Sequence, residues 1–220
     1  MISLEGKLEF LLELDQKDHL STEDMRTIEQ FSSDDTDEVR IRVAEILNNF
    51  SSDFSDKLLL KLIDDKSELV RVNACDSLCN SVSTKAIEAL KPHAVKDTSL
   101  VRAYAIMSIL DIATNTNYSK DELIKFYMDS LKKERVHWVK IYYYKVLYCS
   151  GIKSFFPNLI NELNSRNYRT RIAVVKCLMD VLDDENIDII KELLIKRLNS
   201  EKAESVRDCI KRLLKQINSY

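Results

Sequence analysis

Few residues of this chain have both the type and the spacing that chemistry requires. Cys75 and Cys79 stand four residues apart, so a helix would place both thiols on one face, where two thiolates can bind zinc. No second Cys or His pair completes such a site, because His19, His93 and His137 are scattered along the chain. Packing of the two cysteines as small apolar side chains is the simpler interpretation, and we predict no metal site.

Signatures of common enzyme classes are also missing. The chain has two glycines in 220 residues, whereas phosphate-binding loops and dinucleotide-binding turns need several at fixed spacing. It contains no HExxH segment, and spacing selects no pair among its many carboxylates for acid–base chemistry. We therefore predict no catalytic residue, no cofactor and no enzymatic activity.

Side chains suited to binding are more prominent. Ten of the 17 aromatic residues lie between positions 126 and 168, and tyrosine and tryptophan often dominate binding because they bury a large area at little entropic cost. Packing in the core remains the alternative for each of them. The candidate partner-binding residues, aromatic or basic, are Tyr104, Trp138, Tyr142, Lys145, Lys176 and Arg212.

A repeated segment sets the positions of these residues. It occurs six times, at intervals of 31, 31, 38, 31 and 36 residues. Residues four and eight places after its anchor are apolar or aromatic, so they share one helical face with the anchor and predict a buried stripe. The next residue after the anchor is basic in all six copies. The anchors are Val39, Val70, Val101, Val139, Thr170 and Val206.

Each repeated segment follows another amphipathic segment, which predicts helical hairpins. One hairpin cannot cover its own apolar face, so neighbours must stack. Pro157 is expected near a helix start, Pro92 to kink or stop its helix early, and Ser119 with Glu122 to form a capping box. The predicted fold is an all-α, right-handed α-solenoid (superhelix) of about six hairpins plus an N-terminal capping helix.

We predict a single domain over residues 1–220. Residues 1–20 form the N-terminal cap in this interpretation. The six hairpins are expected approximately over residues 22–50, 55–81, 84–114, 119–150, 155–183 and 187–218.

The acidic turn followed by Val-Arg and a helix of small residues resembles the HEAT-repeat superfamily, especially the short bacterial, phycobilin-lyase-like type. The resemblance covers roughly residues 22–218. It implies a ladder in which turn acids and helix arginines hydrogen-bond between successive repeats. The residues that match this ladder are Asp34, Arg40, Asp65, Arg71, Arg102 and Arg207. Repeats four and five depart from the pattern at Lys140, Ser165 and Thr170, which puts the ladder in doubt there.

Charge is divided unevenly along the chain. Residues 1–110 hold 13 basic and 21 acidic residues, whereas residues 111–220 hold 20 and 15. The acidic excess is concentrated in residues 1–56, whose net charge is −10. Such polarity can steer a charged partner, and the alternative is a solvated surface that is merely uneven.

These observations favour a non-enzymatic scaffold or adaptor that grips a protein partner in a concave groove. A narrower form of this hypothesis has the acidic N-terminal half bind a basic protein, as an antitoxin or immunity factor would. No apolar run approaches the roughly 18 residues that span a bilayer, and Glu5 and Glu9 stand where a signal peptide is basic. We expect a soluble, cytoplasmic, bacterial protein, monomeric and without a membrane.

The alternative function is nucleic-acid binding by the basic, aromatic C-terminal half. Alkylpurine DNA glycosylases that use HEAT-like repeats resemble this chain in architecture, but they place several tryptophans and an aspartate around the DNA. This chain has Trp138 alone, with Asp111 and Asp180 as the candidate pocket acids. A pigment lyase is a third hypothesis, which depends on the family resemblance and on no residue of a tetrapyrrole site.

Overall fold

The structure, a computed structural model, describes residues 2–218. They form two compact units: unit 1 ends at Leu123 and unit 2 begins at Ile124. All regular structure within residues 2–218 is helical, so the predicted all-helical stack of about six hairpins, preceded by one further helix, is confirmed. The single domain over residues 1–220 stays a prediction, and the two units are described separately below.

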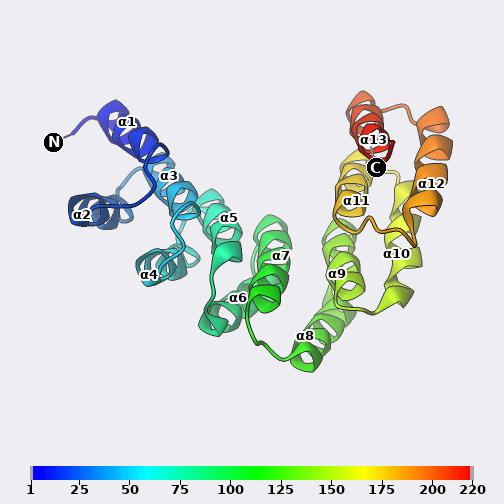
Figure 1. Ribbon diagram of the computed structural model, residues 1–220, viewed down its shortest axis with the longest axis horizontal. Coiled ribbons are helices and arrows are strands. Elements are labelled where there is room, and N and C mark those ends of the chain that lie inside the picture. The colour runs from blue at the N-terminus through cyan, green and yellow to red at the C-terminus, as the bar shows by residue number, and fades with distance from the viewer. Residues whose placement is uncertain (1, 219–220) are drawn as a thin grey trace. The chain divides into compact units, whose positions relative to one another are not determined.

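Unit 1 contains the N-terminal helix and the first three hairpins. Its helices are α1 (Leu4–Leu14), α2 (Thr22–Phe31), α3 (Asp37–Leu47), α4 (Asp53–Leu62), α5 (Glu68–Ser77), η1 (Leu78–Asn80), α6 (Thr84–Lys96) and α7 (Ser99–Asn115). Within this unit α1, α3, α5 and α7 follow one another in one layer, while α2, α4 and α6 form the other (Figure 1). We call the layer with α3, α5 and α7 the second-helix layer, because it contains the second helix of each hairpin.

Unit 2 contains the last three hairpins, and its boundary with unit 1 falls inside α8. Its helices are α8 (Lys120–Lys133), α9 (His137–Cys149), η2 (Lys153–Phe155), α10 (Phe156–Asn161), η3 (Glu162–Asn164), α11 (Tyr168–Asp180), α12 (Ile187–Ser200) and α13 (Glu204–Ile217). Here α9, α11 and α13 form the second-helix layer, and α10 and α12 lie beside it (Figure 1).

The anchor residues of the repeated segment lie in the core of their units. The five anchor valines are fully buried, and the sixth anchor, Thr170, is 2% exposed. Because apolar residues recur four and eight places later on the same helical face, each second helix buries a continuous stripe against its neighbours. This stripe drives the stacking, since an isolated hairpin would leave it in water.

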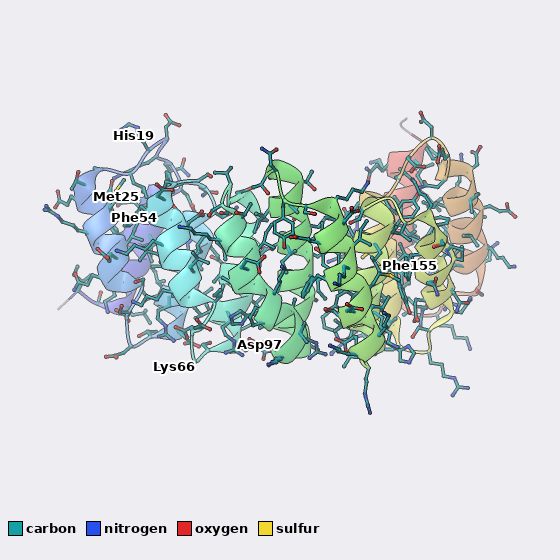
Figure 2. The ribbon with its side chains drawn as sticks, turned by 90° about the horizontal axis from the view of Figure 1, so that it is seen from below. His19, Met25, Phe54, Lys66, Asp97 and Phe155 are labelled. Carbon is teal, nitrogen blue, oxygen red and sulfur yellow. The ribbon has the colours of Figure 1, made fainter. Side chains whose placement is uncertain are left out.

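The turns of unit 1 lie at two opposite edges. Lys66 and Asp97 belong to successive turns inside hairpins and lie along one edge, whereas His19, in the connection from α1 to α2, lies at the other (Figure 2). The turns within hairpins are thereby brought close enough for side chains of one turn to reach the next.

Of the two prolines, Pro157 marks a helix start as predicted, whereas Pro92 lies inside a helix. Pro157 stands in the first turn of α10, as expected. Pro92 does not stop α6, which continues to Lys96. Pro92 is exposed, so water can hydrate the carbonyl that loses its N–H donor. The first helix of the fifth hairpin is not continuous, because α10 is flanked by the 3-10 turns η2 and η3.

Helix α9 ends in a Schellman motif. The N–H of Ile152 donates to the carbonyl of Leu147 (2.9 Å), and the N–H of Gly151 donates to that of Tyr148 (2.9 Å). Gly151 has φ of 98°, a conformation that costs little only without a Cβ atom. At the start of α8, the Glu122 N–H donates to Ser119 Oγ (3.4 Å), which is one half of the expected capping box.

Candidate binding surfaces and the arginine ladder

A buried arginine connects the first two turns of unit 1. Arg40, on α3, is 3% exposed. Its Nε and Nη2 donate to the two carboxylate oxygens of Asp65 at 2.7 and 2.9 Å, in the bidentate geometry that a guanidinium favours. Its Nη1 donates to the backbone carbonyl of Asp34 at 2.6 Å. One side chain therefore holds together the turns of two successive hairpins.

The same arrangement repeats one hairpin later. Arg71, on α5, donates through Nε and Nη2 to both carboxylate oxygens of Asp97 at 2.9 and 2.8 Å. Its Nη1 donates to the carbonyl of Asp65 at 2.8 Å. The turn acid of the third hairpin is thus Asp97, one place later in the repeat than Asp34 and Asp65.

Each turn acid also caps the helix that follows it. The N–H of Thr36 donates to Asp34 Oδ1 (3.0 Å) and the N–H of Ser67 donates to Asp65 Oδ1 (2.8 Å). Negative charge at a helix N-terminus is favourable because it satisfies unpaired N–H groups and opposes the helix dipole. The acid therefore fixes the start of one helix while it binds the arginine of the preceding hairpin.

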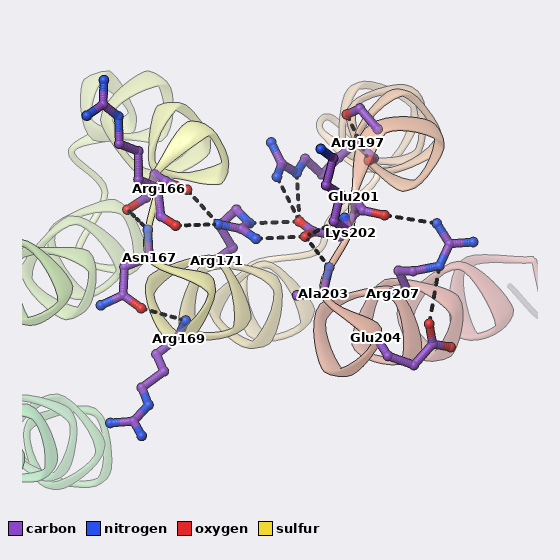
Figure 3. A network of polar contacts seen from close by, with 12 residues as sticks. Arg166, Asn167, Arg169, Arg171, Arg197, Glu201, Lys202, Ala203, Glu204 and Arg207 are labelled. Atoms are coloured by element: carbon purple, nitrogen blue, oxygen red, sulfur yellow. Dashed lines mark hydrogen bonds and ion pairs between the residues drawn. The ribbon is translucent and has the colours of Figure 1, made fainter.

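Unit 2 contains the most buried of these pairs, although sequence reasoning doubted the ladder in the fifth repeat. Arg171 donates through Nε and Nη2 to both carboxylate oxygens of Glu201, each at 2.7 Å (Figure 3). The Glu201 side chain is fully buried and also accepts from Arg197 Nε (2.9 Å) and the Ala203 N–H (2.9 Å). Glu201 and Arg171 occupy the turn-acid and basic positions of the repeat, so the signal for this pair was present in the sequence.

The remaining ladder residues lie near the ends of the units. Lys7 of α1 takes the part of an arginine, and its Nζ donates to Asp34 Oδ2 at 2.5 Å. Arg102 Nη1 donates to the carbonyl of Asp97 (2.7 Å), and Arg207 Nη1 donates to that of Glu201 (3.1 Å). Lys140 has no carboxylate at the turn position of the fifth repeat, which is Ser165.

The ladder lowers the pKa of its carboxyl groups. Hydrogen bonds from Arg171, the Ala203 N–H and Arg197 outweigh burial and bring the pKa of Glu201 to about 2. Burial alone would raise the pKa of Asp97, but hydrogen bonds from Arg71, His93 and the Thr98 N–H lower it to about 2. Every one of these carboxylates is ionised and fully engaged, which suits stacking of hairpins rather than proton transfer.

Of the five cysteines, Cys75, Cys177 and Cys209 are buried, Cys79 is half-buried and Cys149 is exposed. Burial raises the pKa of the Cys79 thiol to about 11 and that of Cys177 to about 12, and it raises the pKa of Cys75 further. Thiols in this state are poor nucleophiles and poor metal ligands. Among residues 2–218, no group of three or more His, Cys, Asp or Glu side chains is arranged to bind a metal ion.

The predicted partner-binding residues fall in both units. Tyr104 lies in unit 1 on α7 and is 36% exposed. In unit 2, Trp138 and Tyr142 of α9 are partly buried and meet edge to face, with ring centroids 5.5 Å apart. Packing against the core therefore accounts for part of both aromatic rings.

The three basic candidates of unit 2 differ in exposure. Lys176 and Arg212 are exposed, and both act electrostatically on the Cys209 thiol, so α11 and α13 bring their charges close together. Lys145 is only 5% exposed, and its Nζ donates to Asp180 Oδ2 at 2.5 Å. This differs from the expectation of an ammonium open to a partner, because Asp180 on the next second helix neutralises it.

Asp180 and Asp111, the candidate pocket acids, are exposed residues on second helices of different units. Asp180 Oδ2 accepts a hydrogen bond from Lys145 Nζ at 2.5 Å, so this carboxylate is already engaged within unit 2.

Sequence reasoning missed a hollow between α1 and α3 in unit 1. It has a volume of about 340 Å³, and its lining combines apolar and charged side chains: Leu8, Leu12, Glu38, Ile41, Arg42 and Glu45. Arg42 donates to Asp15 and, at 3.0 Å, to Glu45 Oε2, so its charge is neutralised. Relative to the anchor Val39, Glu38 stands one place before, Arg42 three places after and Glu45 six places after. These repeat positions therefore define the face of α3 that lines the hollow.

The two units carry opposite charge. Residues 1–123 contain 14 basic and 24 acidic residues, a net charge of −10, whereas residues 124–220 contain 19 and 12, a net charge of +7. A charged partner would therefore be attracted by one unit and repelled by the other.

Comparisons with known proteins concern the fold. Residues 26–110 match a family model described as HEAT repeats. A solved structure described as the crystal structure of an engineered protein is 18% identical, with a TM-score of 0.40 over 98% of this chain and 90% of that chain. No curated protein matches the chain. No helix within residues 2–218 has the length and apolar character to cross a membrane.

Proposed function

Because residues 26–110 match a family model of HEAT repeats, we propose that the chain is a non-enzymatic scaffold that binds a protein partner on the second-helix layer of unit 1. The buried ladder holds the hairpins in register, and the outer face of the same helices carries the partner. Stacked helical repeats of this kind provide extended surfaces, which suit a macromolecule better than a small substrate.

The observation that carries this proposal is a row of exposed side chains on α3, α5 and α7. We call it the acidic face, and its residues are Glu38, Glu45, Leu69, Asp76 and Tyr104. Leu69 is 52% exposed, and the side chains of Glu38 and Asp76 make no hydrogen bond within residues 2–218. Apolar and aromatic side chains among exposed carboxylates are the composition expected of a binding surface for a basic protein.

The residues of the acidic face belong together by register. Glu38 and Leu69 precede their anchors by one place, Tyr104 follows its anchor by three, and Asp76 follows by six, so all four positions lie on one helical face. Burial raises the pKa of Tyr104, and the charge of Asp76 raises it further, which places these two residues of neighbouring helices close together. An antitoxin or immunity factor that binds a basic toxin is the narrower form of this proposal.

Site-specific photo-crosslinking tests the proposal. A photoreactive residue in place of Leu69 or Tyr104 should give one discrete protein adduct in the native cytoplasm. The matched control is Val95, an exposed residue of α6 in the other layer, which should give no such adduct. Equal adducts from all three positions, or none from Leu69 and Tyr104, would contradict the proposal.

Nucleic-acid binding by unit 2 is the second candidate. The positive charges of Lys176 and Arg212, which both act on the Cys209 thiol, favour it. Binding to phosphates weakens steeply with salt, because it releases counterions. A gel shift with a duplex DNA and a single-stranded RNA at low salt should therefore reveal it. A shift that Lys176→Glu and Arg212→Glu abolish would favour this function over protein binding.

A further inference from the structure

We propose that the hollow between α1 and α3 binds a large apolar side chain from a basic segment of the partner protein. This inference rests on the proposed function and adds the chemistry of the segment that unit 1 recognises. Two features of the hollow support the inference, an apolar floor and an acidic rim.

The floor of the hollow is apolar and accessible. Leu8, Leu12 and Ile41 line it, and Leu12 is 55% exposed although its neighbours Leu11 and Leu14 on the same helix are fully buried. The size of the hollow, about 340 Å³, is at the lower end of the range for ligand sites, which suits one or two large side chains. An apolar side chain placed there would remove Leu12 from water.

The rim of the hollow is negative. Glu38 and Glu45 both lie on α3, and each is about one helical turn from Arg42, on opposite sides of it along the helix. Arg42 pairs with both Asp15 and Glu45, so these three side chains together keep one negative charge. With Arg42 included, residues 1–56 have a net charge of −10. Lysine or arginine side chains of the segment, next to the inserted residue, would meet the Glu38 carboxylate. This carboxylate makes no hydrogen bond within residues 2–218.

These features select a basic segment over the other occupants. An acidic peptide or a nucleic acid would be repelled by the charge of unit 1. A second copy of this chain could offer its own basic unit 2, but a large apolar side chain among exposed basic ones is what the hollow requires. The face of α13 that carries Lys211, Arg212 and Lys215 has no large exposed apolar residue within the described part of the chain. At the start of α11, however, Tyr168 is 44% exposed beside the exposed Arg166 and Arg169, so a second copy is the competing occupant that the sedimentation outcome below separates.

Fluorescence anisotropy with the full chain tests the inference. The probe is a fluorescein-labelled peptide of sequence KKAWAKK, and the control peptide is KKAAAKK. We expect the chain to bind KKAWAKK about tenfold more tightly than KKAAAKK, because only the first places a large apolar side chain in the hollow. Equal affinity for the two peptides would overturn the inference.

Two pairs of variants locate the binding. Leu12→Ser and Glu38→Lys should each weaken KKAWAKK binding about tenfold. Their controls are Val95→Ser and Glu23→Lys, which alter exposed residues of α6 and α2 in the other layer by the same chemistry and should change the affinity by less than about twofold. A uniform loss with Glu38→Lys and Glu23→Lys would show attraction by net charge alone and would overturn the inference.

Further outcomes separate this inference from the proposed function. If sedimentation shows the chain to self-associate, and Leu12→Ser disrupts the assembly, a second copy occupies the hollow and the inference is overturned. If KKAWAKK does not bind but Leu69 and Tyr104 still crosslink to a protein, the inference fails while the proposed function stands. If the crosslinks also fail, both are wrong.

Discussion

Unit 1 and unit 2 use the same hairpin, yet they differ in charge and in the depth of their polar contacts. Unit 1 repeats an Arg–Asp pair at Arg40 and Arg71 with nearly constant distances, whereas unit 2 concentrates two arginines on Glu201. Unit 1 has a net charge of −10 and unit 2 of +7. The buried contacts are thus alike and the surface charges opposite, so the residues that stack the hairpins are not those that set the charge of the surface.

Removal of a turn acid should affect the two units unequally, and this is the largest effect we expect. Glu201→Ala leaves Arg171 and Arg197 without their carboxylate at a fully buried site, so the free energy of unfolding should fall by about 3–5 kcal/mol. Asp65→Ala should cost less, about 1.5–3 kcal/mol, because the Asp65 side chain retains some contact with water and serves one arginine. Urea unfolding followed by circular dichroism measures both.

The matched control for these two variants is Asp35→Ala, since Asp35 is an exposed turn residue of unit 1 with no side-chain hydrogen bond in the described part of the chain. It should change the free energy of unfolding by less than about 0.5 kcal/mol. A cost for Glu201→Ala no greater than that for Asp35→Ala would show that the ladder does not hold the hairpins together.

Acid should weaken both units through the same contacts. The pKa values of Asp97 and Glu201 are lowered to about 2 in the folded chain, so their stabilisation is complete above about pH 5 and is lost as the pH falls toward 2. Each group should contribute about 2–3 kcal/mol over that interval. Urea midpoints should therefore stay nearly constant from pH 7 to about pH 5 and decrease from there to pH 3.

The variant Asp97→Asn separates the contribution of unit 1 from that of unit 2. The asparagine side chain cannot titrate, so the free energy of unfolding should depend less on pH. The contribution of Asp97 to that dependence should be lost, while the contribution of Glu201 remains. An unchanged slope would mean that other carboxyl groups govern the acid response.

The two glycines, one in each unit, should give the smallest and opposite effects. Gly151→Ala should lower the free energy of unfolding by about 1–2 kcal/mol, because Gly151 has φ of 98° at the end of α9. Gly6→Ala in α1 should raise it by about 0.5–1 kcal/mol, since a Cβ there meets only the ends of the exposed Ile2 and Ser3 side chains. Thermal unfolding midpoints compare the two, and shifts of the same sign would contradict this account.

The sequence predicts the stack itself because its signal is periodic. The anchors and the residues four and eight places later specify a buried helical face, and the basic residue after the anchor follows from the same register. Arg171 and Glu201 also obeyed that register, but neighbouring departures at Ser165 and Thr170 concealed the pair. A ladder pair requires only the basic residue after one anchor and the turn acid of the next repeat. The other residues of the turn do not decide whether the pair forms.

Other features depend on contacts that no register reveals. Lys7 binds Asp34 from a helix outside the repeated segment, and Lys145 is buried because Asp180, 35 residues later, supplies its counterion. The hollow beside Leu12 exists because α1 packs on α3, and nothing local in either helix encodes it. The broken first helix of the fifth hairpin is equally hard to predict, since its apolar pattern is that of a continuous helix.

Co-purification from the native cells tests the separation of stacking from binding most directly. Tagged wild-type chain should retain a basic protein in a fixed ratio, and the double variant Glu38→Lys with Asp76→Lys should lose it while its thermal unfolding midpoint stays unchanged. Retention of the same partner by the double variant, or the absence of any partner from the wild-type chain, would contradict the account.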